Sequence, residues 1–159
     1  MKKEEKNRKT KTFIYKGLGI PVKLINAPMK KAFGEWCLAI NMSKLMLLVL
    51  EEIIHKPTTL NGDELRYIRT FLEMTTTAFG KVLGVSHVAV LKWEGEKNKA
   101  SPSMELCIRL YVLNHLHAKD DEFRALYNDI SLERLSKRPK AARHTMAIDA
   151  SLDELKLAQ

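Results

Sequence analysis

The sequence predicts a mainly α fold, with a helical domain over residues 59–118 and a small α+β region with short strands before it. Apolar residues recur at helical spacing in that range, and residues that favour helix N-termini precede several of the runs. Short apolar segments separated by glycine and proline precede the helices and are typical of strands. With 159 residues, 45% of them hydrophobic, the chain is long enough for one domain, or for one domain with a smaller appendage.

Composition divides the chain into four zones. Residues 1–12 form a basic tail that we expect to be flexible, and residues 13–58 form the small α+β region. Residues 59–118 form the main helical domain, and residues 119–159 form a polar C-terminal extension that we expect to be weakly ordered beyond Ser136.

The first predicted elements are the segments FIY, IPVKLINA and GEWCLAI between residues 13 and 40, which read as short strands. Ser43 is the expected N-cap of a helix that continues to His55, where Pro57 prevents further extension. Asn61 and Glu64 have the spacing of a capping box, which starts a helix that we expect to end near residue 74. Further helices are predicted over residues 77–83, 87–94 and 103–117.

The segment TTTAFGKVLGVSHVAVLKWEGEKNK, residues 75–99, matches two short helices packed across a tight turn. Gly80 allows the two backbones to approach closely, and Gly84 tolerates the positive φ that the turn needs. Hydrophobic side chains occupy the inward positions of both helices: Phe79, Leu83, Val85, Val90 and Trp93. The joint pattern predicts a helix-turn-helix, whose second helix enters the major groove of DNA.

Residues 60–111, LNGDELRYIRTFLEMTTTAFGKVLGVSHVAVLKWEGEKNKASPSMELCIRLY, resemble the phage-repressor (Cro/C1, XRE-like) helix-turn-helix family. Within that group they are most similar to the DNA-binding half of HigA/MqsA-type antitoxins of type II toxin–antitoxin systems. The resemblance implies a lambda-repressor-like five-helix domain over residues 59–118. The sequence departs from the family at Thr76, where Gln is usual, and at Gly80, where Ala is usual. It also lacks the zinc-binding cysteines of the MqsA-type members, so no metal is implied.

The resemblance assigns base reading to His87, Val88 and Lys92 on the second helix. His87 and Lys92 can donate hydrogen bonds to guanine, and Val88 can contact a thymine methyl group. A plain surface histidine at His87, and a nonspecific phosphate contact at Lys92, are the alternatives.

Contacts to the DNA backbone are expected from two places. Thr76 and Thr77 lie at the start of the first helix of the motif, where Thr76 is also a candidate N-cap, and Ser86 caps the second helix. Lys97, Asn98 and Lys99 follow the second helix. The residues expected to hold the motif together are Gly80, Gly84, Val90, Trp93, Arg69 and Glu94. Among them, Arg69 and Glu94 are predicted to form an ion pair, with an independent phosphate contact of Arg69 as the alternative.

Charge and cysteine usage limit the other classes of function. The net charge is +8, but residues 2–16 hold seven Lys or Arg against two Glu, so the excess lies mainly in the N-terminal tail. Cys37 and Cys107 fit neither a disulfide framework nor a zinc site, and each is expected to be buried. No catalytic motif is recognised, and we expect neither enzymatic activity nor a cofactor. The chain shows neither a signal peptide nor a membrane span, which predicts a cytoplasmic protein without a membrane partner.

The predicted function is sequence-specific DNA binding by a transcriptional regulator, the antitoxin and autorepressor of a toxin–antitoxin operon. The alternatives are a phage-type or mobile-element repressor without a toxin, and a protein-interaction module with a degenerate helix-turn-helix. A homodimer would read two half-sites roughly 34–36 Å apart. Its interface would use Cys107, Leu110, Tyr111 and Leu113, unless this face is a lid on the core. A toxin would contact residues 13–58 or the chain after Ala118.

Overall fold

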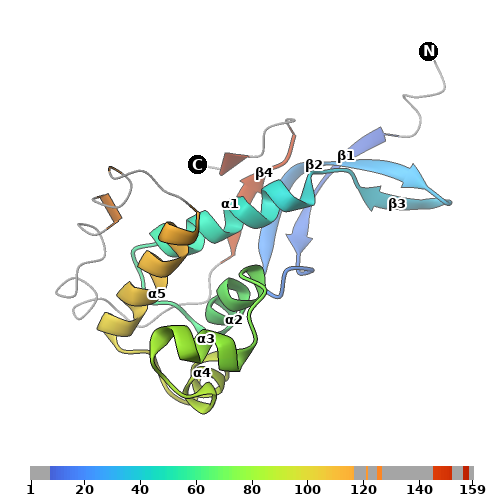
Figure 1. Ribbon diagram of the computed structural model, residues 1–159. Helices are drawn as coiled ribbons and strands as arrows, with labels where there is room; N and C mark the ends of the chain where they lie inside the picture. Colours follow the sequence, from blue (N-terminus) through green and yellow to red (C-terminus); the bar gives the residue numbers. More distant parts are fainter. Residues whose placement is uncertain (1–7, 117–120, 122–124, 127–144, 152–155, 158–159) are drawn as a thin grey trace. The chain divides into compact units, whose positions relative to one another are not determined.

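The computed structural model describes residues 8–116, 121, 125–126, 145–151 and 156–157 (Figure 1). These residues form a five-stranded sheet as well as helices, so the prediction of a mainly α fold is wrong. In chain order the elements are β1 (Arg8–Tyr15), β2 (Val22–Ala32), β3 (Glu35–Leu38), α1 (Met42–His55), α2 (Gly62–Phe71), α3 (Thr76–Leu83), α4 (His87–Glu94), α5 (Pro102–His115), β4 (Met146–Asp149) and β5 (Lys156–Leu157).

The chain divides into two compact units. The first comprises residues 1–48 and 144–159 and contains the sheet, and the second comprises residues 49–143 and contains α2 to α5. The boundary falls inside α1. Within the described residues, no helix is both long and apolar enough to cross a membrane.

The long strand β2 is the centre of the sheet (Figure 1). It pairs antiparallel with β1 along one edge. Its other edge is shared, because residues 22–25 pair in parallel with β4 and residues 29–32 pair antiparallel with β3. The register with β1 shifts next to Asn26, whose φ is 51° and whose amide donates to the Thr12 hydroxyl at 3.1 Å. This bulge lets β2 serve two different partners on one edge.

Strands β4 and β5 lie in the segment that was predicted to be a weakly ordered extension, so that expectation is wrong for its described residues. The four residues of β4 are too few to show an alternating pattern, and their partner β2 lies more than a hundred positions earlier in the sequence. Ile148 and Ala150 are nevertheless fully buried, together with Val22 and Leu24 of β2. Similarly, β1 begins at Arg8, inside the tail that was predicted to be flexible.

The helix boundaries follow local capping chemistry, with small differences from the prediction. Asn41, rather than Ser43, caps α1, because its side chain accepts from the Lys44 amide at 3.0 Å. The capping box of Asn61 and Glu64 is confirmed. Residues 59–116 contain four helices, α2 to α5, and α1 ends before this range, so the expected five-helix domain is not found there.

Arg109 of α5 is completely buried in the helical unit. Its guanidinium donates to the backbone carbonyls of Ile54 and Lys56 at 2.8 and 2.7 Å, and to that of Thr58 at 2.7 Å. Carbonyls at the end of a helix lack partners within that helix, so Arg109 satisfies groups at the end of α1 and in the loop after it. The side chain therefore ties α5 to this segment.

Two acidic side chains extend this buried polar cluster. Glu105 accepts from the Leu60 amide at 2.5 Å and lies 3.6 Å from Arg109. Glu64 forms a buried ion pair with Lys56 at 2.6 Å while it also completes the capping box. Sequence reasoning found the capping box but neither of the buried cations. The cluster fixes the start of α2 against the end of α1 and against α5.

Burial raises the pKa of the Glu105 carboxyl above its usual value, because the Leu60 amide and the charges of Arg109 and Lys56 offset the desolvation only in part. A raised pKa in the folded state means that stability is highest while the group is protonated and falls as the pH rises through that pKa. Glu105→Gln keeps the acceptor for the Leu60 amide but does not ionise. We therefore expect the wild type to lose stability relative to this variant as the pH rises above about 4, the ordinary pKa of glutamate, and through the raised pKa of Glu105.

Urea unfolding of both proteins at several pH values measures this difference. Contributions from the other titrating groups cancel in the comparison. A stability difference that stays constant over the whole range would contradict the assigned direction of the Glu105 shift.

Candidate nucleic-acid interface

Helices α3 and α4 meet across a turn that depends on two glycines. Gly84 ends α3 with φ 69°, a left-handed conformation that side chains disfavour, as predicted. The Val85 amide donates back to the Gly80 carbonyl at 2.8 Å, which closes the turn. A Cβ atom on Gly80 would lie 2.7 Å from the carbonyl oxygen of Val85, so the prediction that this position must be small is confirmed.

Each helix of the motif begins at a hydroxyl cap. Ser86 caps α4, as predicted, and accepts from the Ala89 amide at 3.2 Å. Thr75, rather than Thr76, caps α3 and accepts from the Ala78 amide at 3.1 Å. Thr76 and Thr77 are consequently the first two residues of α3, where backbone amides that have no partner in the helix collect.

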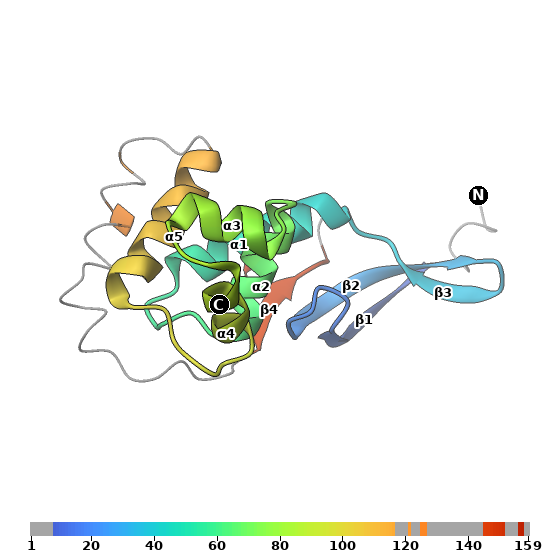
Figure 2. The same cartoon turned by 60° about the horizontal axis from the view of Figure 1, so that its bottom comes forward.

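The side chains predicted to face inward in the motif differ in how deeply they are buried. Phe79 and Val90 are almost completely buried, while Leu83, Val85 and Trp93 are half-buried. Figure 2 shows α4 nearly end-on, with α3 beside it. The burial of Val90 agrees with the prediction that it supports the motif. Trp93 is only partly buried, so part of its side chain is exposed to solvent.

The predicted ion pair between Arg69 and Glu94 is present and joins α2 to the end of α4. Arg69 Nε lies 2.6 Å from Glu94 Oε1, and Nη2 lies 3.0 Å from Oε2, so the contact is bidentate. The third guanidinium nitrogen donates to the Met74 carbonyl at 2.9 Å. The Glu94 side chain is 4% exposed, and its hydrogen bond raises the pKa of Arg69.

Two further contacts, which sequence reasoning missed, fix Glu94. Arg66, one turn before Arg69, approaches the carboxylate at 3.4 Å, but its side chain is 53% exposed. Gly62 at the start of α2 lies directly against the Glu94 carbonyl, where a Cβ atom would clash. The approach of Gly62 to α4 has no signal in the sequence, because glycine at the start of a helix is ordinarily read as a capping feature.

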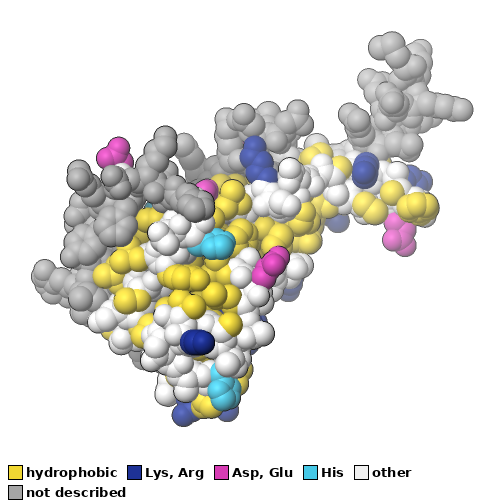
Figure 3. Space-filling model, viewed as in Figure 1, with side chains coloured by type: hydrophobic (Ala, Val, Ile, Leu, Met, Phe, Trp, Pro, Cys, Tyr) yellow, Lys and Arg dark blue, Asp and Glu magenta, His cyan; other side chains and the backbone are white. Residues whose placement is uncertain are grey.

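Four side chains of α4 face solvent: His87, Val88, Leu91 and Lys92. Val88 is 44% exposed and Leu91 is 52% exposed. Figure 3 shows basic, histidine and apolar side chains at the end of the helical unit where Figure 1 places α4. Hydrogen-bond donors beside apolar groups match the edges of base pairs, which present acceptors and the thymine methyl group.

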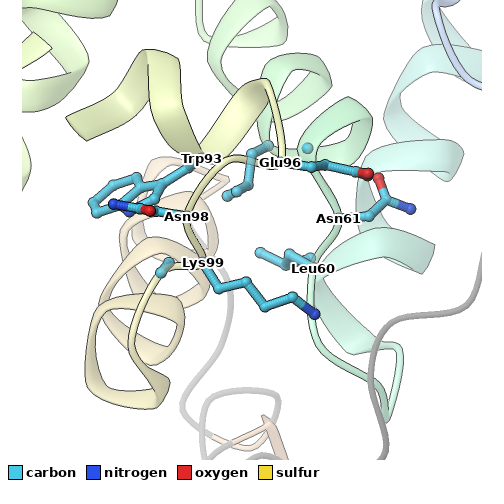
Figure 4. Close-up of a pocket in the computed structure, with 9 residues that line it drawn as sticks. Leu60, Asn61, Trp93, Glu96, Asn98 and Lys99 are labelled. Carbon is cyan, nitrogen blue, oxygen red and sulfur yellow. The ribbon is translucent and has the colours of Figure 1, made fainter. Parts of the chain in front are cut away.

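The loop after α4 contains Lys97, Asn98 and Lys99, all of them exposed. The amides of Lys97 and Asn98 donate to the Lys92 carbonyl at 2.9 and 3.2 Å, so the backbone at the start of the loop is held against the end of α4. Asn98 and Lys99 also line a pocket of about 150 Å³ beside Trp93 and Asn61 (Figure 4). Its volume is below the roughly 300–1,000 Å³ of typical small-molecule sites.

Charge is unevenly distributed within the helical unit. Residues 49–116 contain eight Lys or Arg and eight Asp or Glu. Several of these charges neutralise one another in buried pairs, including Lys56 with Glu64 and Arg69 with Glu94. The α3–α4 segment, residues 75–99, retains four lysines against the paired Glu94 and one exposed acid, Glu96. This segment is therefore locally cationic.

Cys37 and Cys107 are both exposed, so the expectation that each is buried is wrong. Cys37 lies on the short strand β3, and Cys107 lies on the outer side of α5, where the sequence pattern alone does not distinguish it from its buried neighbours. In the part of the chain that the structure describes, no three His, Cys, Asp or Glu side chains come together as a metal site.

Comparison with known proteins gives no match to a family model, a curated protein or a solved structure.

Arg69 and Arg66 make a matched pair of variants, since both extend from α2 to the same carboxylate. We expect Arg69→Ala to cost about 3 kcal/mol of unfolding free energy, because it leaves the buried Glu94 without its bidentate partner. Arg66→Ala removes a longer, solvent-exposed contact and should cost about 0–1 kcal/mol. Arg69→Lys should recover little of this unfolding free energy, since an ammonium group does not reproduce the bidentate contact. Urea unfolding measures all three, and equal losses at Arg66 and Arg69 would contradict the account.

Proposed function

We propose that the chain is a sequence-specific DNA-binding transcriptional regulator that inserts α4 into the major groove. The observation that carries the proposal is the exposed face of α4, where the side chains of His87, Val88 and Lys92 lie in solvent. The ion pair of Glu94 with Arg69 fixes the end of the helix. An α-helix fits the width of the major groove, where each base pair presents its own pattern of donors, acceptors and methyl groups. In this proposal Leu91 lies beside Val88 and gives a second apolar contact.

Backbone contacts orient the helix in the groove. The amides at the start of α3, together with Thr76 and Thr77, suit one phosphate, and Ser86 suits another. Lys97, Asn98 and Lys99 add affinity that depends on salt but carries little sequence information. The Arg69 guanidinium is occupied by Glu94 and the Met74 carbonyl, which favours its structural role over an independent phosphate contact.

Fluorescence anisotropy with the DNA upstream of the gene, and with random duplex DNA, tests the proposal. The wild type should prefer the upstream DNA by roughly a thousandfold or more. His87→Ala and Lys92→Ala should each reduce this preference about tenfold, whereas Lys97→Ala should weaken binding to both duplexes equally and lower the salt slope by about one.

Lys44→Ala, an exposed lysine at the start of α1, is the matched charge control and should change neither quantity. If the wild type binds both duplexes equally well, the regulator proposal fails. The better account is then that the chain is a protein-interaction module with a degenerate helix-turn-helix.

Within this proposal, the regulator is the antitoxin of its operon, a cytoplasmic protein that represses its own gene as a homodimer. The face of α5 named above as a possible interface is divided, since Leu113 lies in the core, Leu110 and Tyr111 are half-buried, and Cys107 is exposed. The surface around Cys107 is therefore the part of this face that is most accessible to a second copy.

Co-expression with the product of the adjacent reading frame tests the antitoxin role. The expected result is growth arrest by that product alone and restored growth when the chain is present. His87→Ala should still restore growth, because neutralisation uses a surface other than α4. If growth stays arrested when the wild-type chain is present, the antitoxin role fails, and a repressor without a toxin partner becomes the better account.

A further inference from the structure

The turn between β2 and β3 exposes a large aromatic side chain. Phe33 and Gly34 are the two loop residues of this hairpin, and Ala32 pairs with Glu35 across it. Phe33 is 107% exposed, so its ring has no contact that shields it from water. Figure 2 shows β2 and β3 as a narrow ribbon that ends in this turn.

The backbone at Phe33 is unfavourable for its side chain. Phe33 has φ 52° and Gly34 has φ 87°, which are the two positive values of a primed hairpin turn. Asn-Gly is the preferred sequence for such a turn, whereas the Cβ atom of a bulky residue is crowded in the left-handed region. The ring adds no packing that offsets this crowding. A strained residue that does not stabilise the fold points to a function.

Lysines surround the hairpin end on both faces of the ribbon. Lys30 and Lys31 are adjacent on β2 and both exposed, so they extend from opposite faces. Lys31 lies opposite Trp36 of β3, and the Lys9 ammonium stacks 4.0 Å above the Trp36 ring. The cation–π contact holds Lys9 at the hairpin. Glu35 is the one acidic residue between residues 8 and 48.

The charge of the chain is concentrated in the sheet unit rather than in the helical unit. Residues 8–48 contain eight Lys or Arg against the single Glu35, whereas residues 49–116 are balanced. Figure 3 shows apolar, basic and acidic side chains together at the end of the hairpin. Such an excess of positive charge favours a polyanionic partner.

The arrangement distinguishes among polyanions. A membrane surface would meet one face of the ribbon, which leaves the lysines of the other face without a partner. The minor groove of duplex DNA has a phosphate strand on each side, and apolar wedges such as Phe enter between its base pairs. The lysines at the hairpin end donate to acceptors that A·T and T·A pairs present alike in the minor groove, and the apolar tip forms no hydrogen bond there.

We propose that the β2–β3 hairpin is a DNA-binding arm, in which Lys30, Lys31 and Lys9 contact phosphates on both sides of the minor groove and Phe33 inserts between base pairs and bends the duplex. The arm adds a second DNA contact to the one proposed for α4 and does not rest on it. Binding by the arm requires no base-specific hydrogen bonds and is therefore independent of sequence.

Fluorescence resonance energy transfer across a random duplex of about 30 base pairs, labelled at both ends, measures binding and bending by the full chain. The wild type should increase the transfer efficiency. Phe33→Asn should abolish the increase and weaken binding about tenfold, because it removes the aromatic ring that stacks on a base. Since Asn tolerates positive φ, this variant should unfold at the same temperature as the wild type or higher.

Phe33→Leu keeps an apolar wedge and should retain the bend. Lys30→Ala and Lys31→Ala should each lower the salt slope by about one and provide a second test if Phe33→Asn does not fold. Ile14→Asn and Lys23→Ala are matched controls, because these exposed residues lie opposite each other elsewhere on β1 and β2. They should leave binding and bending unchanged.

The same assay with the double variant of His87→Ala and Lys92→Ala separates the two proposals. Bending that survives in this variant supports the arm whether or not α4 reads sequence. The arm is refuted if Phe33→Asn binds and bends like Ile14→Asn, or if the matching single strand binds more tightly than the duplex. Binding to vesicles of phosphatidylcholine and phosphatidylserine in place of duplex DNA would refute it as well.

Discussion

The bidentate ion pair between Arg69 and Glu94 is the contact on which the α3–α4 surface depends. Helix α4 has only eight residues, which is too short for stability on its own, so its orientation comes from its anchors. Glu94, the last residue of α4, joins the helix to α2 through its ion pair with Arg69 and through the close approach of Gly62. Ser86 and the turn at Gly84 define the other end. With both ends fixed, the intervening face is free to carry apolar residues in water.

The frame around this anchor is itself held by buried polar groups. Arg109 binds three backbone carbonyls at the end of α1 and beyond it, and Glu105 binds the Leu60 amide just before α2. These contacts position the first residues of α2, and α2 in turn carries Arg69. Removal of one member of such a cluster leaves another buried group without its partner, which costs more than the loss of an exposed contact. The helical unit thus joins its short elements through charge pairs as well as through apolar packing.

Local chemistry explains which features could be predicted from the sequence. The cap at Ser86, the capping box at Asn61, the left-handed Gly84 and the pairing of Arg69 with Glu94 all depend on short spacings or on a recognisable motif. The features that were missed depend on distant partners or on the exposed surface. Strand β4 joins the sheet by pairing in parallel with β2, which lies far earlier in the chain, and the carbonyls bound by Arg109 carry no side-chain signal. The strained Phe33 reads in the sequence as an ordinary apolar residue between two strands.

The central claim is that the exposed face of α4 meets DNA. The most direct measurement is a titration of the isotopically labelled full chain with the duplex upstream of its gene, followed through the backbone amide chemical shifts. The account predicts large changes at residues 86–92 and 97–99 and at the start of α3, in addition to those at the β2–β3 arm. Bound DNA that leaves those amides unchanged, with the shifts confined to other elements, would contradict it.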